Sequence, residues 1–347
     1  MINLGAKRPD ISDVADDWRD KLYAFLFDDR DKKVWVTDGR SRISKHDTFF
    51  KKMEKTIEYH ESKGDLTADE CQWVKKELNY FKTHFDTIVK AGEAELKRLK
   101  TNFRRRAKRT TSNGKDEFKA LMVDLYESLT QSDCSGVAIS HYFFRELNIK
   151  TCPYCNRQYT FTLDEKDAKS APEYDHFYDK SDYPLLAVSF YNLVPSCHVC
   201  NHVKGKKKTV KVNPYFRGFE SNFYLYDKKD KTKRLNALEI ISQGDGSLDL
   251  RKEDGSESSE DNGNLKAFGL KSLYAMHDDY VKEIIEKAAA YDKTARQQIA
   301  DTFQKRGYTP DHVFDFVWGK YLDDAQYENR VLSKLTKDLL EQLEIKR

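Results

Sequence analysis

The sequence predicts a mostly helical α+β protein, in which a central strand, turn, strand and helix unit with a four-cysteine metal site is flanked by two helical regions. Three observations predict this class. Two Cys-x-x-Cys pairs stand near the middle of the 347 residues. Runs between the pairs have the pattern of strands, and apolar residues outside them recur with the period of amphipathic helices. We place the three regions at residues 1–148, 149–215 and 216–347.

The central cysteines have the spacing of a structural zinc site. The pairs are Cys152-Pro-Tyr-Cys155 and Cys197-His-Val-Cys200. Each pair lets two thiolates reach one Zn²⁺ at about 2.3 Å from a tight turn, and two pairs complete a tetrahedral site that leaves no position for water. The insert between them is longer than that of a simple zinc ribbon, so a folded segment should stand there. The alternative is four unrelated thiols or disulfides. Cys71 and Cys134 lie outside the pattern and are expected to be reduced core residues.

The insert has the pattern of two strands joined by a turn. Residues 173–178 alternate polar and aromatic side chains, and residues 185–191 form a second apolar run. The segment 179–184 between them is rich in turn formers. A helix should then begin with Ser196 as its N-cap and carry Cys197, Cys200, Asn201 and Lys204.

These motifs resemble the HNH endonucleases, whose ββα-metal fold is often held by two Cys-x-x-Cys knuckles. The resemblance spans roughly residues 150–210. It is carried by Cys-Pro-Tyr-Cys (152–155), Tyr-Asp-His-Phe (174–177), Tyr-Asn-Leu-Val-Pro-Ser-Cys (191–197) and Cys-Asn-His-Val-Lys-Gly (200–205). It implies a central ββα-metal HNH unit that hydrolyses phosphodiester bonds in DNA.

The resemblance also implies a role for each matching residue. His176 corresponds to the general base that takes a proton from the attacking water, and Asp175 corresponds to a ligand of the catalytic metal. Asn192 corresponds to the middle Asn, which holds the loop so that the base is correctly aimed. Asn201 stands where the family often has its last His and is expected to be the second metal ligand, with His202 as the alternative. Oxygen ligands favour Mg²⁺ or Mn²⁺ as the catalytic ion.

The residue types fit this chemistry without the family. Phosphodiester hydrolysis needs a water activated near neutral pH, and His has the unperturbed pKa closest to that range. It also needs a cation that stabilises charge on the phosphate and on the leaving oxygen. For an isolated Asp-His pair a structural histidine is the simpler interpretation. Inside the four-cysteine frame the catalytic interpretation is favoured.

The charge is balanced overall but concentrated in two basic clusters. The 61 Lys and Arg against 58 Asp and Glu leave a net charge of +3, which by itself does not indicate nucleic acid. One cluster runs from Lys97 to Arg109, and the other runs from Lys204 to Lys211. Lys and Arg supply sequence-independent affinity through phosphate contacts, although a charged stretch on a long helix is usually a solvated face. The predicted nucleic-acid-binding residues are Lys204, Lys206, Lys207, Lys208, Arg104, Arg105 and Arg106.

Helices should dominate both flanking regions. An apolar stripe from Val74 to Phe103 predicts a long amphipathic or coiled-coil helix, with a break at Asn113-Gly114. Further helices are expected at 15–27, 46–62, 115–131, 137–147, 264–304 and 310–344. Phe223–Tyr226 and Leu238–Ile241 are predicted to form a small hairpin, and Gln243–Gly263 a mobile loop.

The layout is also similar to nuclease subunits of bacterial anti-phage systems such as the Septu PtuB proteins, which work beside an ATPase. That similarity implies antiviral defence and an ATPase partner docked on the helical region 1–148; the alternative is that these helices only complete the fold or form a homodimer. No apolar run approaches the roughly 20 residues of a membrane span and no signal-peptide core is present, so a cytoplasmic protein with reduced thiols is expected.

Two other functions stay open at this point. One is a catalytically silent zinc module that binds nucleic acid or a protein partner. The other is a restriction endonuclease with its own target recognition.

Overall fold

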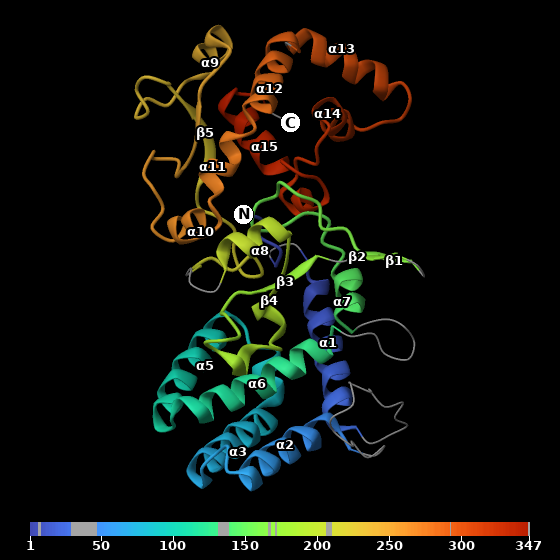
Figure 1. The fold of residues 1–347 in the computed structure, drawn as a ribbon. Helices are drawn as coiled ribbons and strands as arrows, with labels where there is room; N and C mark the ends of the chain where they lie inside the picture. The colour runs from blue at the N-terminus through green and yellow to red at the C-terminus, as the bar shows by residue number, and fades with distance from the viewer. Residues whose placement is uncertain are drawn as a thin grey trace. The chain divides into compact units, whose positions relative to one another are not determined.

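The computed structural model describes residues 1–5, 8–28, 47–130, 139–165, 168–170, 172–205, 210–291 and 293–345. The chain divides into two compact units, each built from segments that are distant in sequence (Figure 1). Unit 1 comprises Met1–Arg8, Ile149–Phe161 and Ser196–Arg347, and unit 2 comprises Pro9–Asn148 and Thr162–Pro195. The region predicted as one nuclease core, 149–215, therefore contributes to both units.

Unit 2 is mostly helical. The predicted helices at 15–27, 46–62, 115–131 and 137–147 correspond to four of its helices, although residues 46, 131 and 137–138 lie outside the described part of the chain. The helices are α1 (Asp10–Phe27), α2 (Phe49–Lys63), α3 (Ala68–Thr83), α4 (Phe85–Val89), α5 (Glu93–Arg106), α6 (Ser112–Ser128) and α7 (Ile139–Leu147). Unit 2 also contains a small antiparallel pair, β1 (Leu163–Glu165) and β2 (Ala168–Ser170).

The apolar stripe from Val74 to Phe103 is not one long helix, because α3, α4 and α5 divide it. A straight helix of that length would spread the stripe over about 45 Å. The two breaks, at His84 and at 90–92, fold the stripe back so that its residues are buried in a compact unit. Asn113 and Gly114 do not break a helix either, since both lie in the first turn of α6.

The predicted strand at 173–178 is present as β3 (Glu173–His176), but its partner is not the run 185–191. The partner is β4 (Leu193–Ser196). Residues 185–191 lie in and around two 3₁₀ turns, Pro184–Leu186 and Phe190–Asn192, which pack among the helices of unit 2. There Trp18 Nε1 donates a hydrogen bond to Val188 O at 3.0 Å, and Ser189 Oγ donates one to Ile88 O at 2.7 Å. A short apolar run indicates burial, and burial alone does not separate a strand from a turn.

Unit 1 contains the third strand pair. β5 (Asn222–Tyr226) pairs antiparallel with β6 (Ser247–Arg251). Its helices are α8 (His198–Lys204), α9 (Ala237–Gln243), α10 (Asp261–Phe268), α11 (Leu270–Ala275), α12 (Asp278–Ala290), α13 (Lys293–Gln304), α14 (Pro310–Trp318) and α15 (Ser333–Gln342). Helix α8 begins one residue later than predicted, with Cys197 instead of Ser196 as its N-cap.

Two predictions for unit 1 were wrong. The segment 238–241 lies in helix α9, whose start is fixed by a capping box between Asn236 and Glu239. The segment 243–263, predicted to be a mobile loop, contributes β6 and the first turn of α10 instead. The hairpin partner of β5 therefore comes from that segment, whose polar residues fit a strand with one exposed face.

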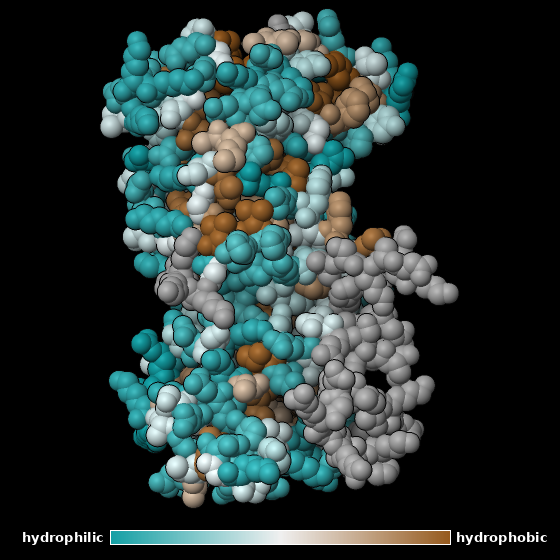
Figure 2. All heavy atoms as spheres, viewed as in Figure 1, coloured by the Kyte–Doolittle hydropathy of each residue, from teal (hydrophilic) through white to brown (hydrophobic). Residues whose placement is uncertain are grey.

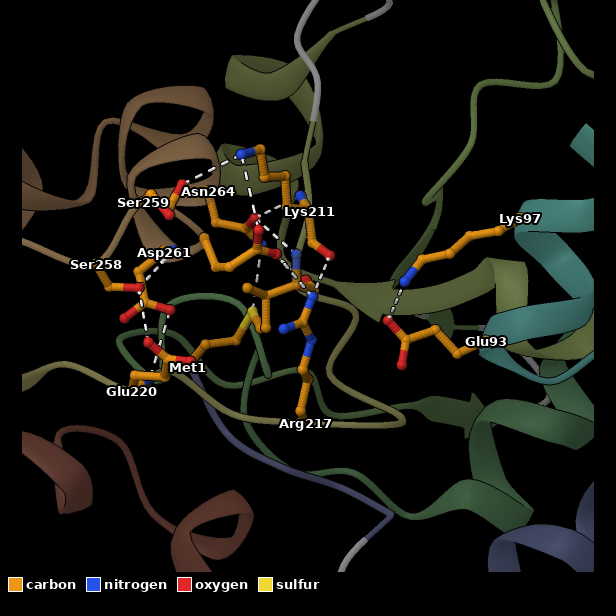
Figure 3. Close-up of polar contacts among 12 residues, drawn as sticks. Met1, Glu93, Lys97, Lys211, Arg217, Glu220, Ser258, Ser259, Asp261 and Asn264 are labelled. Carbon is orange, nitrogen blue, oxygen red and sulfur yellow. Dashed lines mark hydrogen bonds and ion pairs between the residues drawn. The ribbon is translucent and has the colours of Figure 1, made fainter. Parts of the chain in front are cut away.

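Helix α10 anchors the chain that follows α8 (Figure 3). The buried Asn264 accepts the backbone N–H groups of Lys211 and Val212 at 2.8 and 3.0 Å and donates to Val212 O at 2.8 Å. Asp261 accepts the N–H of Ser221 at 2.8 Å. These bonds attach Lys211, Val212 and Ser221 to α10.

The mostly helical α+β class is confirmed. The strands that the structure describes form two-stranded sheets, and helices supply most of both cores. The face drawn in Figure 2 is largely hydrophilic, with apolar side chains in small patches. Among the described helices, none is both long and apolar enough to cross a bilayer.

Candidate metal centre and active site

The cysteines of the two Cys-x-x-Cys pairs converge in unit 1. The Sγ atoms of Cys152, Cys155, Cys197 and Cys200 all lie within 4.8 Å of one another, and those of Cys155 and Cys197 are 3.9 Å apart. Four thiolates around a tetrahedral Zn²⁺ at about 2.3 Å would be separated by about 3.8 Å. All four side chains are buried and none forms a disulfide. The cluster can therefore hold a metal such as zinc, and the disulfide alternative is wrong for these four residues.

The first cysteine pair lies on a short hairpin turn. Cys152 N donates to Gln158 O at 2.9 Å, and Thr151 bridges to Tyr159. The N–H of Arg157 donates to Cys155 Sγ at 3.4 Å, a bond that favours the thiolate. Burial raises the pKa of Cys152. A bound cation reverses that effect, because a coordinated thiol is deprotonated.

Asn156 is the residue that sequence reasoning missed at this site. It follows the first pair with φ of 50°, a left-handed conformation that Asn tolerates. Its buried amide donates to Tyr327 O and Arg330 O at 3.0 and 3.1 Å and accepts from Lys334 N at 3.2 Å. Asn156 thus ties the cysteine hairpin to the start of α15. An Asn directly after Cys-x-x-Cys is the signal that could have found it.

Arg157 makes a second connection between the cysteine hairpin and the rest of unit 1. Its Nε donates to His277 Nε2 at 2.9 Å, which requires an unprotonated ring nitrogen. Burial, and then the charge of Arg157, lower the pKa of His277. The hydroxyl of Tyr274 donates to Cys155 O. Helices α11 and α12 therefore also support the cysteine hairpin.

Asp175 and His176 are the last residues of β3 in unit 2, and both are buried. His176 Nε2 lies 2.9 Å from Ala187 O. Because a carbonyl oxygen only accepts, Nε2 carries a proton, and the neutral ring then has its lone pair on Nδ1. The ring of Tyr126 stands edge-on to the imidazole with a centroid distance of 4.6 Å. Burial and the nearby Asp175 raise the pKa of Tyr126, so the phenol stays protonated.

Asn192 holds the loop that leaves β3. Its Oδ1 accepts from Tyr178 N at 2.8 Å, and its Nδ2 donates to Tyr178 O at 3.1 Å and to Leu186 O at 3.0 Å. Phe177 N donates to Asn192 O at 2.8 Å. The side chain is fully buried. Asn192, predicted among the catalytic residues, is thus a positioning residue that holds the loop after His176.

The predicted ligands of the catalytic ion belong to different units. Asp175 lies in unit 2, whereas Asn201 lies in α8 of unit 1, so their joint coordination of Mg²⁺ or Mn²⁺ stays a prediction. The alternative ligand His202 is exposed and stacks on His198, with 5.6 Å between the ring centroids. Within the described chain, the four cysteines are the only group of three or more His, Cys, Asp or Glu ligands close enough for one ion.

The predicted phosphate-binding residues differ in their exposure and in their partners within the fold. Arg104 and Arg105 are exposed on α5. Arg106 is engaged in the fold, because it donates to both carboxylate oxygens of Glu77 at 2.7 and 3.0 Å and its guanidinium stacks on Tyr80. Lys204 is buried. Lys206, Lys207 and Lys208 lie outside the described residues, as does Cys134.

Comparison with known proteins gives one short similarity. Over 72 residues the chain is 39% identical to a protein of Bacillus thuringiensis named Septu protein PtuB. That segment is 20% of this chain and 26% of the PtuB protein, so the chain spans about a quarter of the relative it matches. No family model and no solved structure matches. The resemblance to the HNH family accordingly rests on the sequence motifs alone.

Proposed function

We propose that this chain is a metal-dependent HNH-type endonuclease that hydrolyses phosphodiester bonds in DNA and acts in bacterial anti-phage defence. The observation that carries the proposal is the setting of His176, whose Nε2–H is held by Ala187 O at the end of β3. The segment shared with a Septu protein supports the defence role. This shared segment agrees with the resemblance of the sequence motifs to those of anti-phage nuclease subunits.

In the proposed reaction His176 is the general base. Its Nδ1 takes a proton from water as the water oxygen forms a bond to phosphorus and the bond from phosphorus to the leaving oxygen breaks. The ring becomes an imidazolium, and Ala187 O accepts the Nε2–H bond throughout, so the ring keeps its orientation and its new charge is stabilised. Asn192 keeps the loop after His176 in place.

The two proposed metals have separate tasks. Mg²⁺ or Mn²⁺, with Asp175 and Asn201 as its proposed protein ligands, would stabilise charge on the phosphate and on the leaving oxygen. Zinc on the four cysteines would have no open coordination position, so it would contribute to folding. Asp175→Ala should therefore give a folded, zinc-loaded and inactive protein.

The test is cleavage of plasmid DNA by the purified protein with Mg²⁺ or Mn²⁺. His176→Ala should lower the rate by roughly 10²–10⁴-fold, the contribution of a general base, and leave zinc content and thermal unfolding unchanged. His312→Ala, a change at an exposed histidine of α14, is the matched control and should cleave normally. Equal rates for wild type and His176→Ala would refute the assignment.

The same assay separates the other functions. A wild-type protein that binds DNA but cleaves none with either ion would be a silent zinc module. Discrete fragments from a defined plasmid would indicate a restriction endonuclease with its own target recognition, whereas an unresolved mixture indicates cleavage without a fixed target.

A further inference from the structure

Lys100 on α5 is a half-buried cation without a carboxylate partner, unlike three other cations of its basic cluster. Lys97 donates to Glu93 at 2.9 Å (Figure 3), Arg98 donates to Glu95 at 2.8 Å, and Arg106 pairs with Glu77. These neighbours have their charge balanced within the fold. Across the part of the chain that the structure describes, no carboxylate lies within 4.0 Å of Lys100 Nζ.

Two aromatic rings hold the Lys100 ammonium instead. Nζ lies 4.3 Å from the ring centroid of Tyr178 and 5.2 Å from that of Tyr183. The two rings are themselves 5.9 Å apart and inclined at 69°. Cation–π contacts position an ammonium but do not neutralise it. The side chain is half-buried, and this burial, with the charge of Arg104, lowers the pKa of Lys100. A positive charge is thus kept where the fold supplies no anion for it.

The rings that hold Lys100 belong to the loop that leaves His176. Tyr178 follows His176 by two residues, and Asn192 binds both its N–H and its C=O. Tyr183 N donates to Asp179 O at 2.9 Å and precedes the 3₁₀ turn that begins at Pro184. The position of the Lys100 ammonium is therefore coupled to the loop that Asn192 holds beside the proposed base.

The other charged residues near this loop differ in how they are paired. Lys180 lies over the Tyr126 ring at 4.3 Å and also lies 3.7 Å from Glu127. Asp179 accepts the N–H of Ser181 at 2.7 Å, and Asp182 is exposed. Arg104 lies one turn after Lys100 on α5, is exposed, and has no ion pair among the described side chains. Lys100 and Arg104 are thus neighbouring cations on one helix face.

We propose that Lys100, with Arg104 beside it, binds a backbone phosphate of the DNA strand that enters the His176 site. The inference rests on the proposed nuclease function and names the residue that positions its substrate. A phosphate would supply the missing anion for Lys100, and an Arg at the next turn adds a second charge-assisted bond to the same group. Such a contact fixes the strand without reading its sequence.

The experiment measures binding rather than cleavage. The parent is His176→Ala, and the probe is a short labelled DNA duplex of random sequence titrated by fluorescence anisotropy over a series of KCl concentrations. Lys100→Gln keeps the length of the side chain but removes its charge. It should weaken binding by about threefold to tenfold and reduce the slope of log K against log salt concentration by about 0.9, the loss of one phosphate contact.

Two variants serve as controls. Lys97→Gln removes a charge one turn earlier on the same helix, where Glu93 already balances it, and should leave the slope unchanged. Lys100→Arg keeps the charge and should restore most of the slope.

The outcomes separate the inference from the proposed function. If Lys100→Gln changes only thermal stability, or if Lys97→Gln changes the slope equally, the inference is overturned while a cleaving wild type still supports the nuclease. If the parent does not bind the duplex and the wild type does not cleave DNA, the proposed function fails and the inference fails with it.

Discussion

Two buried asparagines hold the two candidate sites, one in each unit. Asn192 is fully buried in unit 2 and Asn156 is 1% exposed in unit 1, and each binds backbone groups through both the oxygen and the nitrogen of its amide. A buried amide with both ends bonded can adopt only one orientation. Both residues therefore position neighbours that do the chemistry, His176 in one case and the cysteine hairpin in the other.

Removal of the Asn192 side chain should affect both stability and catalysis. Asn192→Ala leaves the N–H of Tyr178 without its acceptor and removes one of two donors to the carbonyl of Leu186, a loss of about 1–3 kcal/mol in the free energy of unfolding. Cleavage should fall by at least tenfold, since the loop after His176 loosens. Urea unfolding and initial cleavage rates check both parts. A variant as stable and as active as the wild type would show that Asn192 does not position the loop.

Residue roles could be predicted only where the partner is close in sequence. The two cysteines of each Cys-x-x-Cys pair are close in sequence, and their spacing predicted the four-cysteine cluster. The engagement of Arg106 was not, because its partner Glu77 is 29 residues away on another helix. The pattern of Lys and Arg along α5 does not show which of these side chains pair with a carboxylate on another helix once the chain has folded.

At the scale of elements, a short apolar run did not by itself determine the conformation. The runs 185–191 and 238–241 were both predicted to be strands, yet one lies in buried turns and the other in α9. A local signal for α9 was present, since Asn236 and Glu239 have the spacing of a capping box. No comparable signal marks 185–191, whose conformation depends on contacts with α1 and with Ile88.

The cysteine hairpin and α8 should depend on zinc. Cys152→Ser or Cys200→Ser should release zinc and destabilise unit 1, because structural zinc contributes on the order of 10 kcal/mol in zinc-finger peptides. A chelator should have the same effect on the wild type. Metal analysis and thermal unfolding measure both. Cys71 is a buried cysteine of α3 outside the cluster, so the Cys71→Ala protein should contain as much zinc as the wild type. A wild-type protein that contains no zinc would contradict the four-thiolate site.

At the scale of the whole molecule, most of the helical region 1–148 packs with a segment that follows it in the chain, which its sequence does not show. Residues 9–148 form one unit with 162–195, so these helices enclose the segment that carries His176. A protein that binds to this unit could therefore alter the proposed site. We propose that the partner is an ATPase, in line with the likeness to anti-phage nuclease subunits.

Purification from the native host tests this partnership. A nonspecific nuclease endangers its own host, so we expect the tagged chain to bring an ATPase with it and to cleave less DNA alone than in the complex. Mass spectrometry of the purified complex and cleavage rates with and without the partner measure this. A monodisperse chain with full, unregulated activity and no associated protein would argue decisively against a partner.

The sequence by itself determined the features whose signals are local. These are the mostly helical class, the two cysteine knuckles, the strand that begins at Glu173 and the start of α8 to within one residue. The tertiary structure decided the rest: the pairing of β3 with β4 and of β5 with β6, the division into units from distant segments, and the position of Lys100 between two aromatic rings without a carboxylate partner. The physical reason is that spacing and capping act within a few residues, whereas strand pairing, burial and charge balance depend on groups that meet only when the chain folds.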